Sequence, residues 1–201
     1  MTAAETDPAG RGSRAYGEGR EALLAAAVRV VATKGLRHLT YRAVAQEAGV
    51  THGLVTHHFG SRDALIESAL QYSLDHSVPG MTTDPGSGRI EALFEGLAQL
   101  VADDPDTQAF QYELVLESRR RPELQPAVKA LYDSYRDAMR QELGHIGIGP
   151  DEPLVHLLFA AADGLVFQQV CGVNNTTTEE ALARLREIIT LLKEWSESHA
   201  S

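Results

Sequence analysis

The chain has 201 residues, of which 43% are hydrophobic and 23% charged, a composition typical of a globular protein long enough to bury a core. Its single cysteine excludes an internal disulfide framework and a cysteine-rich zinc module. The N-terminus lacks the apolar stretch of a signal peptide, and polar residues interrupt the longest apolar run, residues 153–173. We therefore expect a cytoplasmic protein that makes no use of a membrane.

The net charge of −10 is unevenly distributed along the chain. Residues 11–62 hold eight Lys and Arg against three Asp and Glu, whereas residues 63–201 hold ten against twenty-three. A cationic N-terminal region followed by an anionic remainder indicates a protein that contacts phosphate groups with one end only. The overall acidity therefore does not exclude nucleic acid as a partner.

Residues 1–17 show no apolar periodicity and are predicted to be a disordered tail. The pattern then predicts helices over residues 18–34, 41–48, 52–58 and 62–77. Thr40, Thr51 and Ser61 are suitable N-caps, and Gly49 can take the left-handed conformation that ends a helix. Two short helices joined by such a glycine turn predict a helix-turn-helix unit, so we assign residues 18–62 to a DNA-binding domain.

The second half is predicted to be helical as well. Residues 78–88 are rich in Pro, Gly, Ser and Thr and are expected to form a loop. Further helices are expected over residues 89–102, 106–119, 124–143, 152–170 and 178–196. Because no alternation of apolar and polar residues is found, no strands are expected. The predicted fold is all-α with about nine helices: a three-helix helix-turn-helix domain at the N-terminus and a second helical domain over residues 63–201.

The third predicted helix carries a polar, hydrogen-bonding face opposite its anchors Val55 and Phe59. Short polar side chains and one leucine suit the major groove of DNA, where they can bond base edges or contact a thymine methyl. The residues of this face are Thr51, His52, Gly53, Leu54, Thr56, His57 and His58. Residues at the positive N-termini of the second and fourth helices are placed to bind phosphate. These are Thr40, Tyr41, Arg42 and Arg62.

The three histidines of this face also raise the possibility of a metal site. His52 and His57 are five residues apart, His57 and His58 are adjacent, and no Asp, Glu or Cys nearby completes a ligand set. We therefore predict no metal and no cofactor. The chain also lacks a nucleotide-binding glycine motif, a nucleophile elbow and a zinc-protease motif, so no enzymatic activity is expected.

Residues 20–65 resemble the N-terminal domain of the TetR family of regulators. The matching features are Gly35, Thr40, the sequence AVAQEAGVT at 43–51, Gly53, the pair His58–Phe59, and Ser61 followed by a base and Asp-Ala-Leu. The chain departs from the family at Thr56, where a tyrosine that touches the DNA backbone is usual, and at Arg62, where lysine is commoner. These departures concern phosphate contacts and leave the helix-turn-helix intact.

The resemblance implies a ligand-responsive dimer that binds double-stranded DNA at a palindromic operator. The two C-terminal helices carry more apolar residues than one subunit needs, which agrees with pairing between two copies, although burial within one chain is the alternative. The middle helices mix aromatic and polar residues in a way that fits a pocket for a small-molecule effector of unknown identity. The candidate lining residues are His76, Phe94, Phe110, Tyr112, Glu113, Tyr132, Tyr135, His156, Phe159, Asp163 and Phe167.

The sequence therefore predicts a transcriptional repressor that a small molecule releases from its operator. A ligand-activated or co-repressed regulator is an alternative within the same fold. An architectural DNA-binding protein without an effector and an all-α enzyme are rivals from other classes; the enzyme would need a cluster of acids and histidines on facing helices, which the sequence does not offer.

Overall fold

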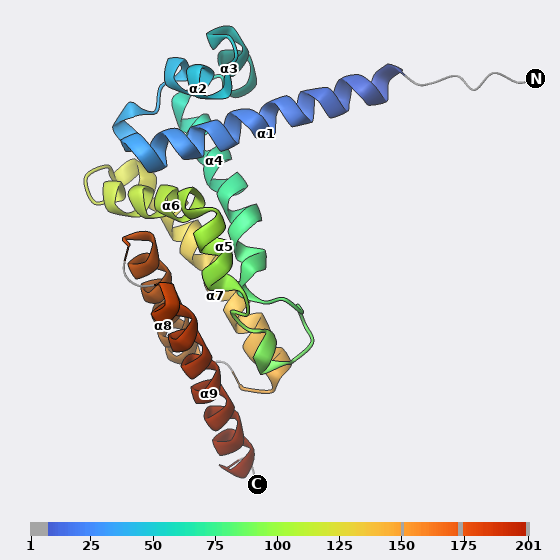
Figure 1. Ribbon diagram of the computed structural model, residues 1–201, viewed down its shortest axis with the longest axis vertical. Coiled ribbons are helices and arrows are strands. Elements are labelled where there is room, and N and C mark those ends of the chain that lie inside the picture. Colours follow the sequence, from blue (N-terminus) through green and yellow to red (C-terminus); the bar gives the residue numbers. More distant parts are fainter. Residues whose placement is uncertain (1–7, 150, 173–174, 200–201) are drawn as a thin grey trace, which may run out of the picture. The chain divides into compact units, whose positions relative to one another are not determined.

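The computed structural model describes residues 8–149, 151–172 and 175–199, and nine α-helices occupy most of these ranges (Figure 1). Within them no strand occurs, and Thr82 and Leu93 form an isolated β-bridge. The all-α prediction is thus confirmed. The chain divides into two compact units, residues 1–72 and 73–201, which we call the N-terminal and C-terminal units. The division falls ten residues after the expected domain boundary, inside a helix that both units share.

The N-terminal unit contains α1 (Pro8–Lys34), α2 (Tyr41–Ala48), α3 (His52–Phe59) and the first part of α4 (Arg62–Ser77). A short 3-10 helix, η1 (Leu36–His38), follows α1. Apolar side chains of α1 are buried, together with apolar side chains of the other elements of this unit. The fully buried side chains include Leu23, Ala27, Val30, Leu36, Leu39, Val44, Val55 and Leu65.

Helix α1 begins at Pro8, ten residues before the expected start. The predicted disordered tail is therefore helical from Pro8 onward, while residues 1–7 lie outside the described residues. Proline is well suited to the first turn of a helix, where its missing N–H has no partner to lose. Extension of an existing helix costs far less free energy than nucleation of a new one. The packed part of α1 can therefore extend toward the N-terminus into residues with a weak helical pattern.

Two arginines of α1 fix the helices of this unit to one another. Arg29 Nε donates to Glu47 Oε1 of α2 at 3.0 Å. Arg20 Nη2 donates to Ser68 Oγ of α4 at 3.0 Å, and its guanidinium carbon lies 5.5 Å from the centre of the Phe59 ring of α3. One long helix thus holds the helix-turn-helix in place by contacts to all three of its neighbours.

The C-terminal unit contains the last residues of α4 and five further helices. These are α5 (Leu97–Asp103), α6 (Pro105–Ser118), α7 (Gln125–Ile146), α8 (Glu152–Val170) and α9 (Asn175–His199). Helix α8 contacts α5, α6, α7 and α9, and α8 and α9 run side by side (Figure 1). By length and hydropathy alone α8 would suffice to cross a membrane. In the single chain it contacts four other helices, and part of its apolar surface stays exposed.

The prediction of a helix over residues 89–102 is wrong for its first half. Three 3-10 turns interrupt this unit, η2 (Val78–Met81), η3 (Ile90–Ala92) and η4 (Pro122–Leu124), and α5 begins only at Leu97. The Phe94 N–H donates to the Met81 carbonyl at 2.8 Å, and Phe94 has a φ of 58°. The backbone of this segment pairs with residues 81–83, which a periodicity argument could not anticipate.

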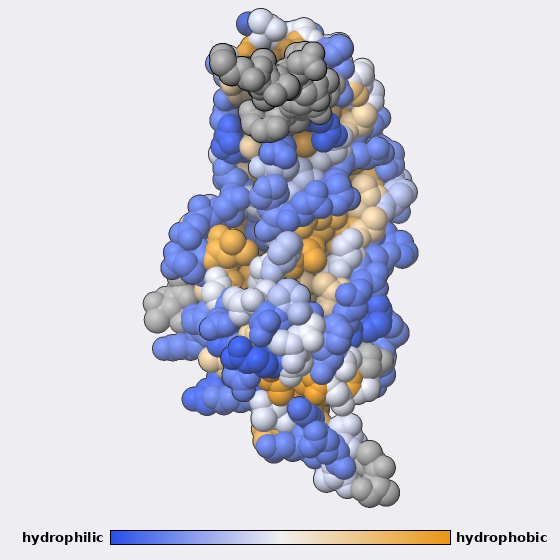
Figure 2. Space-filling view, turned by 90° about the vertical axis from the view of Figure 1, so that its right-hand side faces the viewer, coloured by the Kyte–Doolittle hydropathy of each residue, from blue (hydrophilic) through white to orange (hydrophobic). Residues whose placement is uncertain are grey.

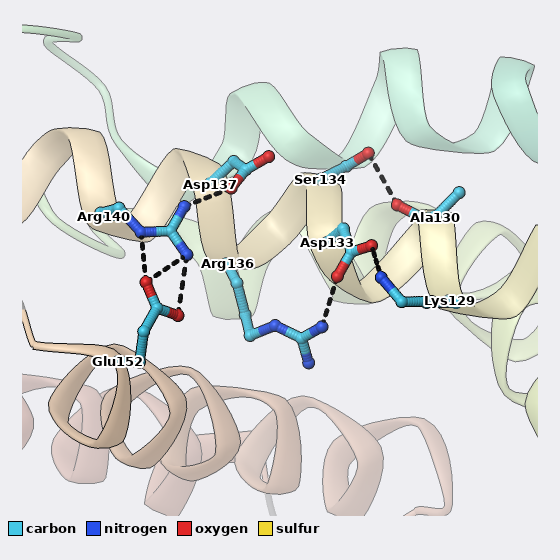
Figure 3. A network of polar contacts seen from close by, with 8 residues as sticks. All are labelled: Lys129, Ala130, Asp133, Ser134, Arg136, Asp137, Arg140 and Glu152. Carbon is cyan, nitrogen blue, oxygen red and sulfur yellow. Dashed lines mark hydrogen bonds and ion pairs between the residues drawn. The ribbon is translucent and has the colours of Figure 1, made fainter.

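An ion-pair network links α7 to the start of α8 (Figure 3). Arg140 donates to both carboxylate oxygens of Glu152, at 2.9 and 3.0 Å, and also contacts Asp137 one turn earlier. Because Arg140 donates to two carboxylates, the pKa of its guanidinium lies well above its ordinary value. The network lies at the surface, so we regard it as orienting the two helices more than stabilising them.

Some large apolar side chains of α8 and α9 remain exposed in the single chain. Leu157 is 64% exposed on α8, and on α9 Leu191 and Trp195 are 64% and 62% exposed. Phe167 and Ile188 are exposed as well. Apolar patches interrupt the largely hydrophilic surface in the space-filling view (Figure 2). Apolar side chains of this size favour burial against another surface.

Candidate functional site

The turn between α2 and α3 forms as the sequence predicts. Thr40 Oγ1 accepts a hydrogen bond from the Ala43 N–H at 3.1 Å and so caps α2. Gly49 follows with a φ of 69°, and its N–H bonds back to carbonyls of the preceding turn. Thr51 occupies the N-cap position of α3, but its side chain makes no capping bond, contrary to expectation. Its hydroxyl is exposed instead.

Helix α3 presents most of the predicted DNA-reading face to the outside. Val55 and Phe59 are buried and hold the helix in place. The exposed residues are Thr51, His52, Gly53, Leu54, Thr56 and His57. Gly53 has nothing within 4 Å of the position that a Cβ would occupy, so the backbone is open to close approach there. Thr56 donates to the His52 carbonyl at 3.2 Å, a bond within the helix.

His58 differs from the other residues of this face because it is half-buried. Its ring lies 6.0 Å from that of Phe59 and 5.9 Å from that of His57. Burial, and then the nearby charges of His57 and Arg20, lower the pKa of His58. His58 is therefore favoured in its neutral form, and its position suits packing beneath the face better than contact with a base.

The phosphate-binding residues predicted at the helix N-termini fall into two groups. Arg42 is exposed at the start of α2. Arg62, in contrast, donates from Nε to the Leu39 carbonyl at 2.9 Å and from Nη2 to the Leu36 carbonyl at 2.7 Å. The Tyr41 hydroxyl is buried, with no hydrogen-bond partner among the described residues, and its ring packs edge-on against His52. Phosphate contact by Arg62 and Tyr41 stays a prediction that this geometry does not favour.

The C-terminal unit contains a small cavity of about 40 Å³, room for a few water molecules. Four predicted ligand-binding residues line it: Phe94, Tyr135, Phe159 and Asp163. The lining also includes six residues that the sequence analysis did not single out: Ser77, Met81, Leu97, Gln108, Ala162 and Val166. Ser77 and Gln108 are polar and nine-tenths or more buried. A position on the inward face of a helix is the one sequence signal that could have indicated Ser77 and Gln108 as lining residues.

The other predicted ligand-binding residues do not line this cavity. Tyr112, Tyr132 and Phe167 contact the cavity residues or one another through their rings. His76 is exposed and lines a second cavity of about 20 Å³. Phe110 is fully buried in the core, and His156 is exposed. Neither these two nor Glu113 lines either cavity.

A buried polar cluster adjoins the cavity. Gln111 Nε2 donates to Ser73 Oγ at 3.1 Å and to Ser77 Oγ at 3.0 Å. The Tyr135 hydroxyl lies 2.5 Å from Ser77 Oγ and 2.9 Å from Gln111 Oε1. Burial raises the pKa of Tyr135, although these hydrogen bonds oppose the effect. The cluster joins the end of α4 to α6 and α7 within this unit.

Asp163 is the carboxylate of the cavity wall. The Tyr112 hydroxyl donates to its Oδ1 at 2.9 Å and lies 3.1 Å from its backbone carbonyl. Burial raises the pKa of Asp163, and the bond from Tyr112 partly offsets that rise. Burial, followed by the charge of Asp163, raises the pKa of Tyr112 strongly. Within the described residues, no group of three His, Cys, Asp or Glu is arranged to hold a metal ion.

Protein-family models match both halves of the chain. The family model for bacterial regulatory proteins of the tetR family matches residues 23–69. The model for the tetracyclin repressor-like C-terminal domain matches residues 88–191, which is more than half of the chain. The two matched ranges contain α3 and the cavity-lining part of α8 respectively.

Curated relatives are similar to part of the chain. The HTH-type transcriptional regulator BetI of Brucella anthropi is 30% identical over 96 residues, 48% of either chain. BetI of Burkholderia ambifaria is 27% identical over 127 residues, 63% of this chain and 60% of BetI. The chain thus spans about half the length of the curated relatives it matches.

Solved structures resemble nearly the whole chain. A TetR-family transcriptional regulator from Rhodococcus sp. is 25% identical with a TM-score of 0.67, covering 88% of this chain and 99% of that one. The multidrug binding protein EbrR in complex with proflavin is 28% identical with a TM-score of 0.55, covering 87% and 99%. From the two matched models and these structures we conclude that the chain belongs to the TetR family of bacterial regulatory proteins.

Proposed function

We propose that the chain is a cytoplasmic, homodimeric transcriptional repressor that binds a palindromic operator and is released from it by a small molecule. The observation that carries this proposal is the exposed polar face of α3 on a correctly closed helix-turn-helix. Membership of the family supports a DNA-binding regulator and argues against an enzyme. Activation or co-repression by the ligand is compatible with the same geometry.

The composition of the α3 face supports sequence-specific contact with DNA. Thr51, His52 and His57 offer hydrogen-bonding groups, and Leu54, 36% exposed, offers an apolar contact for a thymine methyl. Base contacts determine specificity, whereas phosphate contacts contribute affinity without regard to sequence. Removal of His52 or His57 should therefore alter which sites are bound more than whether DNA is bound.

The exposed apolar side chains of α8 and α9 support a dimer through these two helices. Leu157, Leu191 and Trp195 are each more than 60% exposed in the single chain. A two-fold interface uses the same surface on both copies, and a two-fold dimer presents two recognition helices to two half-sites. Burial of these side chains in such an interface removes apolar surface from water.

The cavity of the C-terminal unit supports binding of a small molecule. It combines an apolar wall with a few convergent polar groups, Ser77, Gln108 and Asp163, as binding sites commonly do. The related protein EbrR has been solved in complex with proflavin, ethidium and malachite green. At about 40 Å³ the cavity of this chain admits a small group and must widen for a larger one.

Ligand binding can affect the operator only if the ligand prefers the conformer with weaker DNA affinity. Coupling of this kind amounts to roughly 1–3 kcal/mol, or about 5- to 150-fold in affinity. Helix α4 begins beside α3 at Arg62 and ends at Ser77, which lines the cavity, so it is the covalent connection between the two sites. The proposal therefore assigns the transmission of the signal to α4.

The test is selection of the purified protein against random duplex DNA at physiological salt, followed by sequencing. Enrichment of an inverted repeat supports the proposal. Retention without a shared sequence indicates an architectural protein and contradicts it, as does the absence of retention. His52→Ala should change the enriched sequence, whereas His38→Ala, an exposed histidine of η1 outside the α3 face, should not.

A further inference from the structure

The carboxylate of Asp163 is half-buried and has no cationic partner among the described residues. The residue lies in the middle of α8 and lines the cavity. Within the residues that the structure describes, no Lys, Arg or His forms an ion pair with it, and its hydrogen-bond donor is the Tyr112 hydroxyl. Transfer of a carboxylate into a protein interior is costly unless an opposite charge compensates it. Asp163 therefore offers the cavity a carboxylate that no cation of the described residues compensates.

Aromatic residues contact this carboxylate or line the same cavity: Tyr112 donates to it, and Tyr135 and Phe159 share the cavity wall with it. The Tyr135 and Phe159 rings are stacked with centres 5.7 Å apart, and Tyr132 meets Phe159 edge-on at 5.6 Å. Tyr112 meets Phe167 edge-on at 5.0 Å. Burial raises the pKa of Tyr112, Tyr132 and Tyr135, and the charge of Asp163 adds to the rise at each, while the charge of Arg136 opposes it at Tyr132. Neutral aromatic faces beside a carboxylate are the usual surroundings of a bound organic cation.

The rest of the cavity wall contributes no competing charge. Of its ten lining residues, Asp163 is the one that ionises near neutral pH, and Met81, Phe94, Leu97, Ala162 and Val166 are apolar. The arginine closest in sequence to the surrounding tyrosines, Arg136, donates to Asp133 at 2.6 Å. An anion or an acidic ligand would meet uncompensated repulsion here. A cation with apolar substituents would meet one carboxylate and an apolar wall.

We propose that the effector is a small organic cation of the alkylammonium class, with its charge against Asp163 and its substituents against Tyr135 and Phe159. This inference rests on the proposed function, because it takes the cavity as the effector site. A volume of about 40 Å³ corresponds to a few water molecules, which suits an ammonium head group. A larger body attached to the head group has to extend through the open side of the cavity or widen it.

Isothermal titration calorimetry with two probes of equal shape tests the charge requirement. Phenyltrimethylammonium carries a cationic nitrogen where tert-butylbenzene carries a neutral carbon. The full-length wild-type protein should bind the cation at least about tenfold more tightly than the neutral probe. Equal affinity for the two probes, or no binding of the cation at about 1 mM, would overturn the proposal. This comparison needs no variant and so does not depend on the folding of one.

The variant Asp163→Asn keeps the shape of the side chain and removes its charge. It should lose at least about tenfold in affinity for phenyltrimethylammonium while its affinity for tert-butylbenzene is unchanged. Asp137→Asn is the matched control, because Asp137 is exposed and its partner Arg140 retains both bonds to Glu152. It should bind both probes as the wild type does. Cation binding by Asp163→Asn at wild-type affinity would contradict the assignment.

Retention of DNA in the selection experiment separates this inference from the proposed function. If wild type and Asp163→Asn retain the same operator but neither binds the cation, the cation assignment alone fails. If the cation binds with the expected dependence on Asp163 but no operator is enriched, the proposed regulator function fails and the binding site stands. If the cation also releases the enriched operator from the wild type, both are supported.

Discussion

Arg62 is the residue whose expected role changes most, and its replacement gives the sharpest test of the N-terminal unit. Its guanidinium donates to the carbonyls of Leu36 and Leu39, at 2.7 and 2.9 Å, and so fixes the start of α4 to the segment between α1 and α2. Hydrogen bonds that involve a charged group contribute roughly 1.5–3 kcal/mol each when buried. Arg62 is only half-buried and the two bonds share one side chain, so we expect Arg62→Met to lower the free energy of unfolding by about 2 kcal/mol.

Urea unfolding followed by circular dichroism measures this change directly. Arg62→Lys should recover about half of the loss, because one ammonium group lacks the fork that reaches two carbonyls at once. Arg42→Met is the control: Arg42 is exposed at the start of α2, and its removal should change stability by less than about 0.5 kcal/mol. If Arg62→Met is as stable as this control, the bracing role is refuted and phosphate contact becomes the better explanation for the residue.

Three further predictions concern the turn between α2 and α3, the dimer and the carboxylate of Asp163. Gly49→Ala should destabilise the N-terminal unit by about 1 kcal/mol in the same urea assay, since a φ of 69° strains a residue with a Cβ although no atom would clash with it; unchanged stability would contradict this. Leu191→Asp would bury a charge in the proposed interface and should convert the dimer to monomers, as measured by analytical ultracentrifugation. The control Gln99→Asp, at an exposed site of α5, should leave the dimer intact. A Leu191→Asp variant that remains dimeric would exclude Leu191 of α9 from the interface. Because burial raises the pKa of Asp163, the folded protein takes up this proton at higher pH than the unfolded chain, whose pKa is about 3.9. The Tm of the wild type relative to Asp163→Asn should therefore rise as pH falls from neutral through the raised pKa, and level off below about pH 4; a constant difference, or one of opposite sign, would refute the assigned shift.

Local sequence by itself determined the helix-turn-helix. Thr40 caps α2 and Gly49 closes the turn, and each of these effects acts over a few residues along the chain. The spacing of Val55 and Phe59 marks the side of α3 that is buried. The same holds for α8, whose bounds match the apolar run between Asp151 and the turn at 171–172. Capping, glycine conformation and apolar periodicity are local properties, so they can be read before any tertiary contact is known.

Tertiary structure decided the points at which distant segments meet. The helix expected from residue 89 fails because the Phe94 N–H bonds to the Met81 carbonyl, and Arg62 is drawn to the carbonyls of residues 36 and 39. The cavity brings Ser77 of α4 together with Gln108 of α6 and Asp163 of α8, residues that no spacing in the sequence relates. Every residue has a backbone carbonyl, so the sequence does not show which donor will reach it. Folding determines that, and it also determines which charged side chain has no partner of opposite charge.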